Sequence, residues 1–228
     1  MPRRKARAGR AIPKPNYGEP ISGGMESTIY PVPSGQGLVH KVFTSGWISR
    51  KYIMGGKLGW ITRKAHSMGV EIKDVQPPKY GRFGFTRLSP KLWSKITFIL
   101  TGHSVDVMQT AKKLEIPVPE IFRQVAVEGK QGNYFVLEMS DLRKEGTMLV
   151  PGHRLYEHHR ETPIANFREL TNAIFSDKRK LREAGFVEDI GVHDKFGGFI
   201  IRIDKETGKG ERFLADASNF IFVGVPKK

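Results

Sequence analysis

The chain has 228 residues, 39% of them hydrophobic and 27% charged, which is enough for one ordinary domain or two small lobes with a buried core. It contains no cysteine, which excludes disulfides, thiolate metal sites and thiol catalysis and agrees with a reducing, cytoplasmic location. No apolar run approaches about 18 residues, and no hydrophobic stretch follows the basic start, so we expect neither a membrane span nor a secretory signal.

The formal net charge of +15 is concentrated in two segments. Residues 1–16 carry six basic side chains and no acid, and residues 44–103 carry eleven basic side chains and two acids. The rest of the chain has equal numbers of basic and acidic residues. This distribution predicts a polyanionic partner such as nucleic acid, although a solubilising tail and a solvated insertion would have the same composition.

In chain order, residues 1–17 are predicted to be a disordered arm because they hold almost no large apolar side chain. β-branched and aromatic residues then predict short strands in STIYPV and GLVHKVF, separated by the turn PSGQG. Residues 44–103 mix glycine, aromatic and basic residues, with a short helix expected near 91–100. Their aromatic rings, including Trp93, would either stack on single-stranded nucleic acid or form a small core of their own.

Apolar spacing predicts a helix over residues 104–114, which the prolines of IPVPEIF terminate. FRQVAVEG with GNYFVLEM is typical of one hairpin, and FIIRI with RFLAD of another. Residues 155–184 are expected to be mostly helical, with Pro163 as a start signal. The apolar stripe of this helical segment consists of Phe167, Leu170, Ile174, Phe175 and Leu181. Segregated runs of strands and helices indicate an α+β fold.

A glycine pair and a lysine suggest a phosphate-binding site near the start of the chain. The glycines follow the first expected strand in ISGGMESTIY, where backbone N–H groups can approach phosphate oxygens closely. Lys41 lies in the middle of a later strand, and alternation places it on the same face as Val39 and Phe43. A lysine on an apolar face needs a partner, and phosphate is a natural one. A plain hairpin turn would account for the glycines alone.

The succession ISGGMESTIYPV…GLVHKVF resembles the opening of the protein-kinase-like superfamily, with Met-Glu-Ser in place of the second half of its GxGxxG loop. The GGMES form is similar to RIO-type kinases, and IPVPEIF resembles the corresponding part of RIO-type and aminoglycoside-phosphotransferase-like kinases. The resemblance touches residues 18–43 and 104–220. It implies a bilobal fold with a small β-rich N-lobe over 18–139, into which 44–103 is inserted, and a truncated, mainly helical C-lobe over 140–228.

The resemblance implies that ATP binds to the N-lobe. The loop over its phosphates would contain Ser22, Gly23, Gly24 and Ser27. Lys41 would bind the α- and β-phosphates. Glu138 and Met139, in YFVLEMSDL, would supply backbone partners for adenine. Asp106 would pair with Lys41 in place of the usual glutamate, or else it is a first-turn acid that favours the dipole of its helix.

The resemblance also implies one carboxylate for Mg²⁺ and one for the phosphate acceptor. Asp216, at the end of the strand in RFLAD, is similar in position to the metal-binding Asp of the Asp-Phe-Gly motif, but Ala-Ser follows it here. A strand-end capping residue is the alternative for Asp216. In AGFVEDIGVHDKFGGFIIR, either Asp194 or Asp189 would face the acceptor hydroxyl. The family has a metal-binding Asn five residues after its base. If Asp194 is the base, that position is Phe199, which cannot bind a metal. If Asp189 is the base, that position is Asp194, which could bind Mg²⁺.

These residues imply an ATP- and Mg²⁺-dependent phosphotransferase acting on an alcohol group, such as a Ser or Thr side chain of a protein. Residues 1–16 and 44–103 would bind nucleic acid or another polyanion. Only twelve residues follow Asp216, so we expect a minimal C-lobe with little surface for ordinary peptide recognition. The alternative is a catalytically inactive kinase-like module that docks on nucleic acid or on a ribonucleoprotein or viral assembly.

Overall fold

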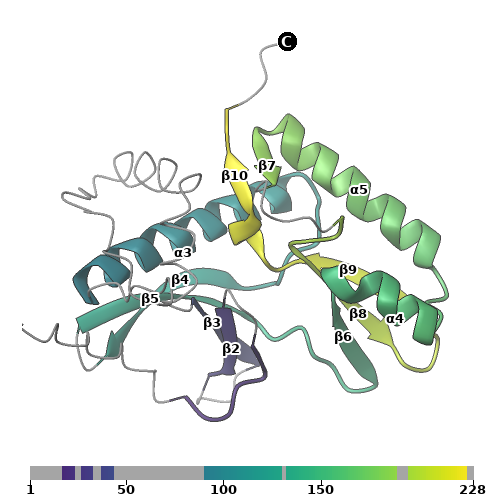
Figure 1. The fold of residues 1–228 in the computed structure, drawn as a ribbon, viewed down its shortest axis with the longest axis horizontal. Helices are drawn as coiled ribbons and strands as arrows, with labels where there is room; N and C mark the ends of the chain where they lie inside the picture. The colour runs from purple at the N-terminus through teal and green to yellow at the C-terminus, as the bar shows by residue number, and fades with distance from the viewer. Residues whose placement is uncertain are drawn as a thin grey trace, which may run out of the picture. The chain divides into compact units, whose positions relative to one another are not determined.

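The computed structural model describes residues 17–23, 27–32, 37–43, 90–129, 132–188 and 195–224. The chain divides into two compact units, Met1–Leu100 with Gln124–Val136 and Thr101–Arg123 with Leu137–Lys228. The described residues form α-helices and three antiparallel sheets, so the α+β prediction is confirmed (Figure 1).

The largest sheet in the described part of the chain has five strands in the order β1-β2-β3-β5-β4. Its strands are β1 (Ser22–Gly23), β2 (Ser27–Pro31), β3 (Leu38–Phe43), β4 (Phe122–Gly129) and β5 (Gly132–Ser140). β2 pairs with both β1 and β3 in antiparallel register, and Ile29 lies opposite Lys41. The strands predicted in STIYPV and GLVHKVF and in the first hairpin are therefore confirmed.

Helix α3 (Pro90–Lys113) joins the core of the first unit through its N-terminal half. The ring centroids of Trp93 and Tyr134 are 4.6 Å apart, and both side chains are buried. The backbone N–H of Phe135 donates to the hydroxyl of Thr97 at 3.2 Å, which ties the helix to β5. Trp93 is thus a core residue between helix and strand, which leaves its ring too buried for base stacking. The other aromatic rings predicted to act with it lie outside the described residues.

Tyr17, the first described residue, also packs on this sheet. Its ring stacks on that of Tyr30 with centroids 4.9 Å apart, and its hydroxyl forms a hydrogen bond with Nδ1 of His40. His40 is itself buried and lies opposite Tyr30 in the register of β2 and β3. Aromatic contacts thus fix the chain against the sheet from Tyr17 onward. Residues 1–16 and 44–89 of the two basic segments lie outside the described residues.

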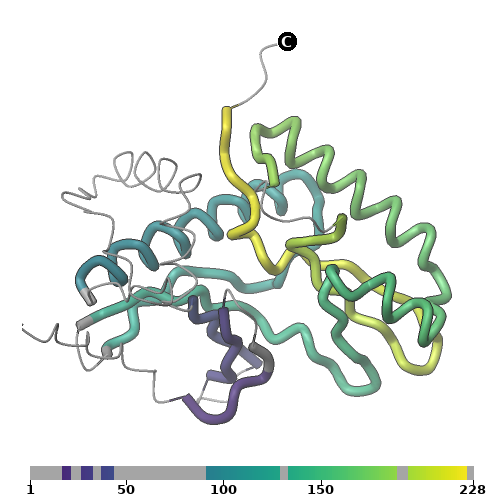
Figure 2. Tube along the Cα trace, viewed as in Figure 1, coloured from purple at the N-terminus to yellow at the C-terminus, as the bar shows by residue number. Residues whose placement is uncertain are grey.

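Helix α3 is one continuous helix of 24 residues, so the prediction of separate helices near 91–100 and 104–114 is wrong. Gly102 costs about 1 kcal/mol relative to alanine inside a helix, which is too little to break one that is well packed. The polar residues beside it are buried rather than in a loop, and Nε2 of His103 donates to the carbonyl of Phe220 at 2.5 Å. Figure 2 shows the yellow C-terminal segment reaching the teal helix at this contact.

The second unit contains two smaller sheets and short helices. One sheet has the order β6-β8-β9, and the other pairs β7 with β10. The strands are β6 (Thr147–Pro151), β7 (Phe186–Glu188), β8 (Phe199–Asp204), β9 (Gly210–Leu214) and β10 (Phe220–Phe222). The helical segments are η1 (Gly152–Arg154), α4 (Leu155–Glu161), α5 (Phe167–Glu183) and η2 (Ala217–Asn219). The β8–β9 hairpin is confirmed, and in the described part of residues 141–228 five strands accompany the helical segments.

The helical segment predicted over residues 155–184 is interrupted between α4 and α5. Pro163 lies in this interruption and does not begin α5, which starts four residues later at Phe167. Leu170, Ile174 and Leu181 face the core as predicted, with exposed fractions of 3% or less. Phe175 is 45% exposed, so its assignment to the apolar stripe is wrong.

A buried ion pair joins α5 to β9. Nε of Arg212 donates to Oδ2 of Asp177 at 2.6 Å, and Nη2 donates to Oδ1 at 3.2 Å. The Asp177 side chain is 1% exposed and that of Arg212 is 25% exposed. The two-point contact satisfies a carboxylate that would otherwise be buried without compensation, and it fixes the rotation of α5 on the sheet.

We predict that Arg212→Met lowers the free energy of unfolding by about 3 kcal/mol, because it leaves the Asp177 carboxylate buried and unpaired. Urea denaturation of the full chain measures this change. Arg154→Met is the matched control, since the Arg154–Glu157 pair is 60% exposed on both sides and should contribute less than about 1 kcal/mol. Equal losses in the two variants would show that the Asp177–Arg212 pair does not stabilise the second unit.

Candidate functional site

Lys41 lies at the centre of β3 in the first unit and is only 3% exposed. Its ammonium group is 5.5 Å from the ring centroid of Phe43, within the range of a cation–π contact. Lys41 and Phe43 are two residues apart on one strand, so their side chains share a face. The prediction that alternation places Lys41 among apolar neighbours is therefore confirmed.

The predicted phosphate loop lies on the β1–β2 connection of the same sheet. Ser22 and Gly23 form β1, and Ser27 begins β2 opposite Phe43 of β3. Gly24 lies outside the described residues. β2 separates β1 from the lysine-bearing strand in the sheet, and the loop role of these residues stays a prediction.

Glu138 and Met139 lie near the end of β5, in the part that belongs to the second unit. Both are buried, and Oε1 of Glu138 accepts a bond from Nε of Arg123 at 2.5 Å. Because this carboxylate is already paired with a cation, a role in adenine binding would fall to the backbone, as predicted.

The chain just after β5 is held by a local ion pair. Arg143 donates hydrogen bonds from Nε and Nη2 to the two carboxylate oxygens of Asp141. Burial raises the pKa of Asp141, but the hydrogen bonds and charge of Arg143 outweigh it, and the pKa lies below its ordinary value. The Asp141 carboxylate is therefore ionised at neutral pH, which maintains its ion pair with Arg143.

Asp106 lies in the middle of α3, on an exposed position of the second unit. Because α3 begins at Pro90, Asp106 is about four turns from the helix N-terminus. The alternative prediction, a first-turn acid that favours the helix dipole, is therefore wrong. Its pairing with Lys41, which belongs to the first unit, stays a prediction.

Asp216 follows β9 directly and precedes the short helix η2. The hydroxyl of Ser218 donates to Oδ1 of Asp216 at 2.6 Å, which orients the carboxylate. Asn219 is 6% exposed, and its Oδ1 is buried and accepts no hydrogen bond among the described residues. Sequence reasoning missed Ser218 and Asn219, although both follow Asp216 closely and carry oxygen ligands.

Gly198 positions the backbone of Asp216. Its carbonyl accepts hydrogen bonds from the N–H groups of Ala215 at 3.1 Å and Asp216 at 2.9 Å. Gly198 has a φ of +85°, and a Cβ there would lie 2.8 Å from the ring of Phe220. Only glycine fits this backbone conformation and this space. The glycine pair in KFGG was the available signal.

Asp189 and Asp194 lie outside the described residues, as does the whole segment 189–194. The structure describes its flanks: Glu188 ends β7, and Lys195 begins the turn that leads to β8. Nζ of Lys178 on α5 contacts both flanks, donating to Glu188 Oε1 at 2.6 Å and to the Lys195 carbonyl at 2.5 Å. The roles of the two aspartates stay predictions.

Phe199 is 2% exposed and begins β8. Its side chain is part of the core and has no oxygen or nitrogen with which to bind a metal. If Asp194 were the base, the second metal ligand of the family would therefore be missing, as the sequence indicates.

The second unit has a groove of about 470 Å³ between α5 and the β8–β9 hairpin. Arg202, Glu211 and Phe213 are among its lining residues, and none of the predicted site residues is. Within the described ranges, no three histidine or acidic side chains gather closely enough to hold a metal ion.

In comparisons with known proteins, no family model, curated protein or solved structure matches this chain. Among the described helices, none combines the length and apolar character that crossing a bilayer requires.

Gly198→Ala should lower the free energy of unfolding by about 3 kcal/mol, because the methyl group meets the Phe220 ring and the positive φ adds about 1–2 kcal/mol of strain. Gly208→Ala is the matched control: its φ is +66°, but the nearest atom to a Cβ is 3.8 Å away, so only the strain should apply. Urea denaturation compares the two. A loss no larger at Gly198 would contradict the tight packing proposed around Asp216.

Proposed function

We propose that this chain is an ATP- and Mg²⁺-dependent phosphotransferase of the protein-kinase-like class, as its resemblance to RIO-type kinases implies. Lys41 binds the α- and β-phosphates of ATP, and the loop from Ser22 to Ser27 covers them. Asp216 holds Mg²⁺. The single observation that carries the proposal is the burial of Lys41 at the centre of β3, in the same sheet as the two strands that flank the glycine pair.

The order of elements in the sheet supports this proposal. Protein kinases place a glycine-rich loop over the phosphates and the phosphate-binding lysine on the third strand. Here β1 and β2 flank the glycine pair, β3 carries Lys41, and α3 connects β3 to β4 in the chain. The sheet order brings β5, whose end carries Glu138 and Met139, next to β3. Hydrogen bonds from the backbone of these two residues would then hold adenine.

The second unit supports the metal-binding role of Asp216. The chain passes from α5 through β7 and the segment 189–194 to the β8–β9 hairpin, and Asp216 follows that hairpin. This is the succession in which the superfamily carries its acceptor-side acid and then its metal-binding acid. β10 returns to pair with β7, so the strand before segment 189–194 and the strand that follows Asp216 and η2 belong to one small sheet.

The oxygen atoms near Asp216 suit Mg²⁺. This ion prefers oxygen ligands such as carboxylates and side-chain carbonyls. Asp216 offers a carboxylate, and Asn219 offers a buried Oδ1 that accepts no hydrogen bond among the described residues. When bound, Mg²⁺ would neutralise charge on the phosphates, and Ser218 would keep the Asp216 carboxylate oriented toward that task.

The acceptor in this proposal is an alcohol group, such as a Ser or Thr hydroxyl of a protein. Asp194 accepts its proton, or Asp189 does so with Asp194 as a further metal ligand. The buried Phe199 favours the second arrangement, because it leaves a carboxylate in the position where the superfamily has its second metal ligand. Asp106, one carbon shorter than glutamate, pairs with Lys41.

A second candidate function is an inactive kinase-like module that binds nucleic acid or a ribonucleoprotein or viral assembly. Two observations favour it: Phe199 is a core residue, and Ala-Ser replaces Phe-Gly after Asp216. The net charge of +15 gives such a module its attraction to polyanions.

Thermal unfolding of the full chain with ATP, with and without Mg²⁺, separates these functions. For the enzyme we predict a rise of about 5 °C in the melting temperature at an ATP concentration about 100 times the dissociation constant, and a smaller rise without Mg²⁺. Asp216→Asn should abolish the Mg²⁺-dependent part, and Lys41→Met should abolish both parts. Glu206→Gln, in an exposed turn, is the control and should leave both unchanged.

No stabilisation of the unaltered chain by ATP in either condition would refute the phosphotransferase and favour the binding module. Stabilisation that persists in both Asp216→Asn and Lys41→Met would refute the assignment of these residues. Transfer of radiolabelled γ-phosphate to a mixture of proteins then distinguishes an active enzyme from a module that only binds ATP.

A further inference from the structure

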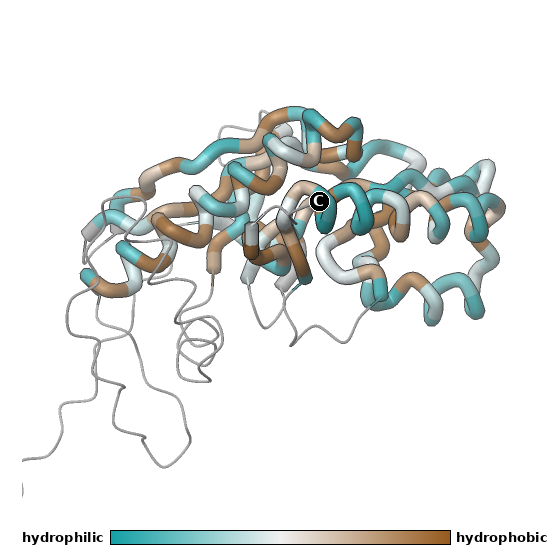
Figure 3. Tube along the Cα trace, turned by 90° about the horizontal axis from the view of Figure 1, so that it is seen from above, coloured by the Kyte–Doolittle hydropathy of each residue, from teal (hydrophilic) through white to brown (hydrophobic). Residues whose placement is uncertain are grey.

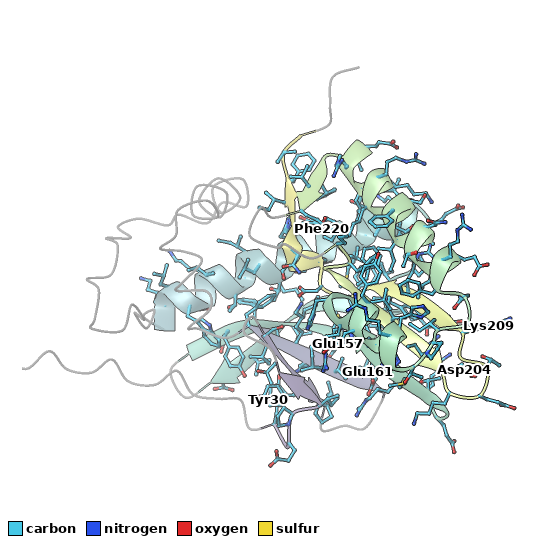
Figure 4. The ribbon with its side chains drawn as sticks, turned by 45° about the vertical axis from the view of Figure 1, so that its right-hand side comes forward. Tyr30, Glu157, Glu161, Asp204, Lys209 and Phe220 are labelled. Carbon is cyan, nitrogen blue, oxygen red and sulfur yellow. The ribbon has the colours of Figure 1, made fainter. Side chains whose placement is uncertain are left out.

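Helix α5 carries an exposed stripe that its contacts with the rest of the second unit do not use. The residues of this stripe are Arg168, Asn172, Phe175, Arg179 and Arg182, and all five are exposed. Their spacings of four, three, four and three residues place them on one face of the helix. The opposite face holds Leu170, Ile174 and Leu181 against the core. In Figure 3 the outer turns of α5 are largely hydrophilic, and Figure 4 shows nitrogen-tipped side chains standing out from this helix.

The three arginines of the stripe have no acidic partner within the described part of the chain. Most other described arginines are paired: Arg123 with Glu138, Arg143 with Asp141, Arg154 with Glu157, Arg202 with Glu211, and Arg212 with Asp177. Glu183 lies one turn beyond Arg179 on the same helix, and no ion pair forms between them. Guanidinium groups suit bidentate recognition of phosphate and carboxylate, so these three groups are available to an external anion.

An aromatic surface continues from the stripe. Phe175 is 45% exposed, and its ring centroid lies 5.5 Å from that of Phe196, which is buried. The ring centroid of Phe196 lies 5.1 Å from that of Tyr156 on α4, and Tyr156 is 46% exposed. Lys178 ties α5 to the turn of Phe196 through the carbonyl of Lys195. Two exposed rings are thus supported by one buried ring and fixed beside the arginines.

We propose that this face of α5 binds single-stranded nucleic acid. The guanidinium groups of Arg168, Arg179 and Arg182 contact phosphates, and bases stack on Phe175 and Tyr156. The fifteen residues from Arg168 to Arg182 span about 21 Å, which is long enough for several nucleotides. An acidic protein would use the charges but not the exposed rings, whereas every base offers a face for stacking. This surface does not depend on ATP binding, and none of its residues belongs to the basic segments 1–16 and 44–103.

Fluorescence anisotropy of the full chain with a labelled 12-nucleotide oligouridine tests this surface. We expect the combined variant R168Q/R179Q/R182Q to bind the oligonucleotide about tenfold more weakly, or weaker still, at moderate salt. The slope of log K against log[salt] should become shallower by about 2, because the variant loses three phosphate contacts and each contributes about 0.7. The matched control is K144Q/K205Q/K209Q, which removes the same charge from exposed positions near the tip of the β8–β9 hairpin, where Figure 4 labels Lys209. The control should weaken binding by less than about threefold.

Phe175→Leu separates stacking from charge. It should weaken binding about fivefold and leave the salt slope unchanged, because it removes the ring but no cation. Circular dichroism and urea denaturation verify that each variant is folded. Equal losses in the arginine variant and the lysine control would overturn the proposal, as would an unchanged affinity in the arginine variant.

A polyglutamate peptide, used as a second probe, distinguishes the partners. If the arginine variant loses polyglutamate binding as strongly as oligouridine binding and Phe175→Leu has no effect on either, the face serves an acidic protein and the nucleic-acid proposal is wrong. Because the stripe variants keep Lys41 and Asp216, they should retain any ATP-dependent stabilisation, so this proposal and the phosphotransferase fail independently.

Discussion

The buried ammonium group of Lys41 is the constraint from which the proposed function follows. At 3% exposure this cation has lost nearly all contact with water, which costs several kcal/mol unless other groups compensate. The Phe43 ring offsets part of this cost from the same face of β3. In the proposed function this buried cation binds the polyphosphate chain of ATP. The glycine loop and a metal-binding acid are then needed to hold the rest of the nucleotide.

Backbone contacts and the hydroxyl of Ser218 position Asp216. The carbonyl of Gly198 accepts the N–H of Asp216, and the ring of Phe220 leaves no room for a side chain at Gly198. His103 of α3 then bonds to the carbonyl of Phe220, so the turn, β10 and the helix support one another. Within this support the hydroxyl of Ser218 orients the carboxylate. Ser218, two residues after Asp216, thus helps to fix the acid locally.

The strands near Lys41 and the β8–β9 hairpin could be predicted from the sequence because alternation along a strand is a local property. The continuity of α3 could not, because Gly102 and its polar neighbours look like a break until His103 is seen to bond a residue over a hundred positions away. The exposure of Phe175 was missed for the same reason: a helical apolar spacing does not show which ring the tertiary structure leaves uncovered. The glycine pair in KFGG marks Gly198 in the sequence, but the reason for it, the ring of Phe220, lies more than twenty residues further along the chain.

A crystal structure of the full chain with Mn²⁺ and a non-hydrolysable ATP analogue tests most directly whether Lys41 and Asp216 serve one nucleotide. The account predicts Nζ of Lys41 about 3 Å from oxygens of the α- or β-phosphate, and an anomalous manganese peak about 2 Å from the Asp216 carboxylate and bound to the same nucleotide. An analogue that contacts only one of the two residues, or binds elsewhere on the molecule, would contradict it.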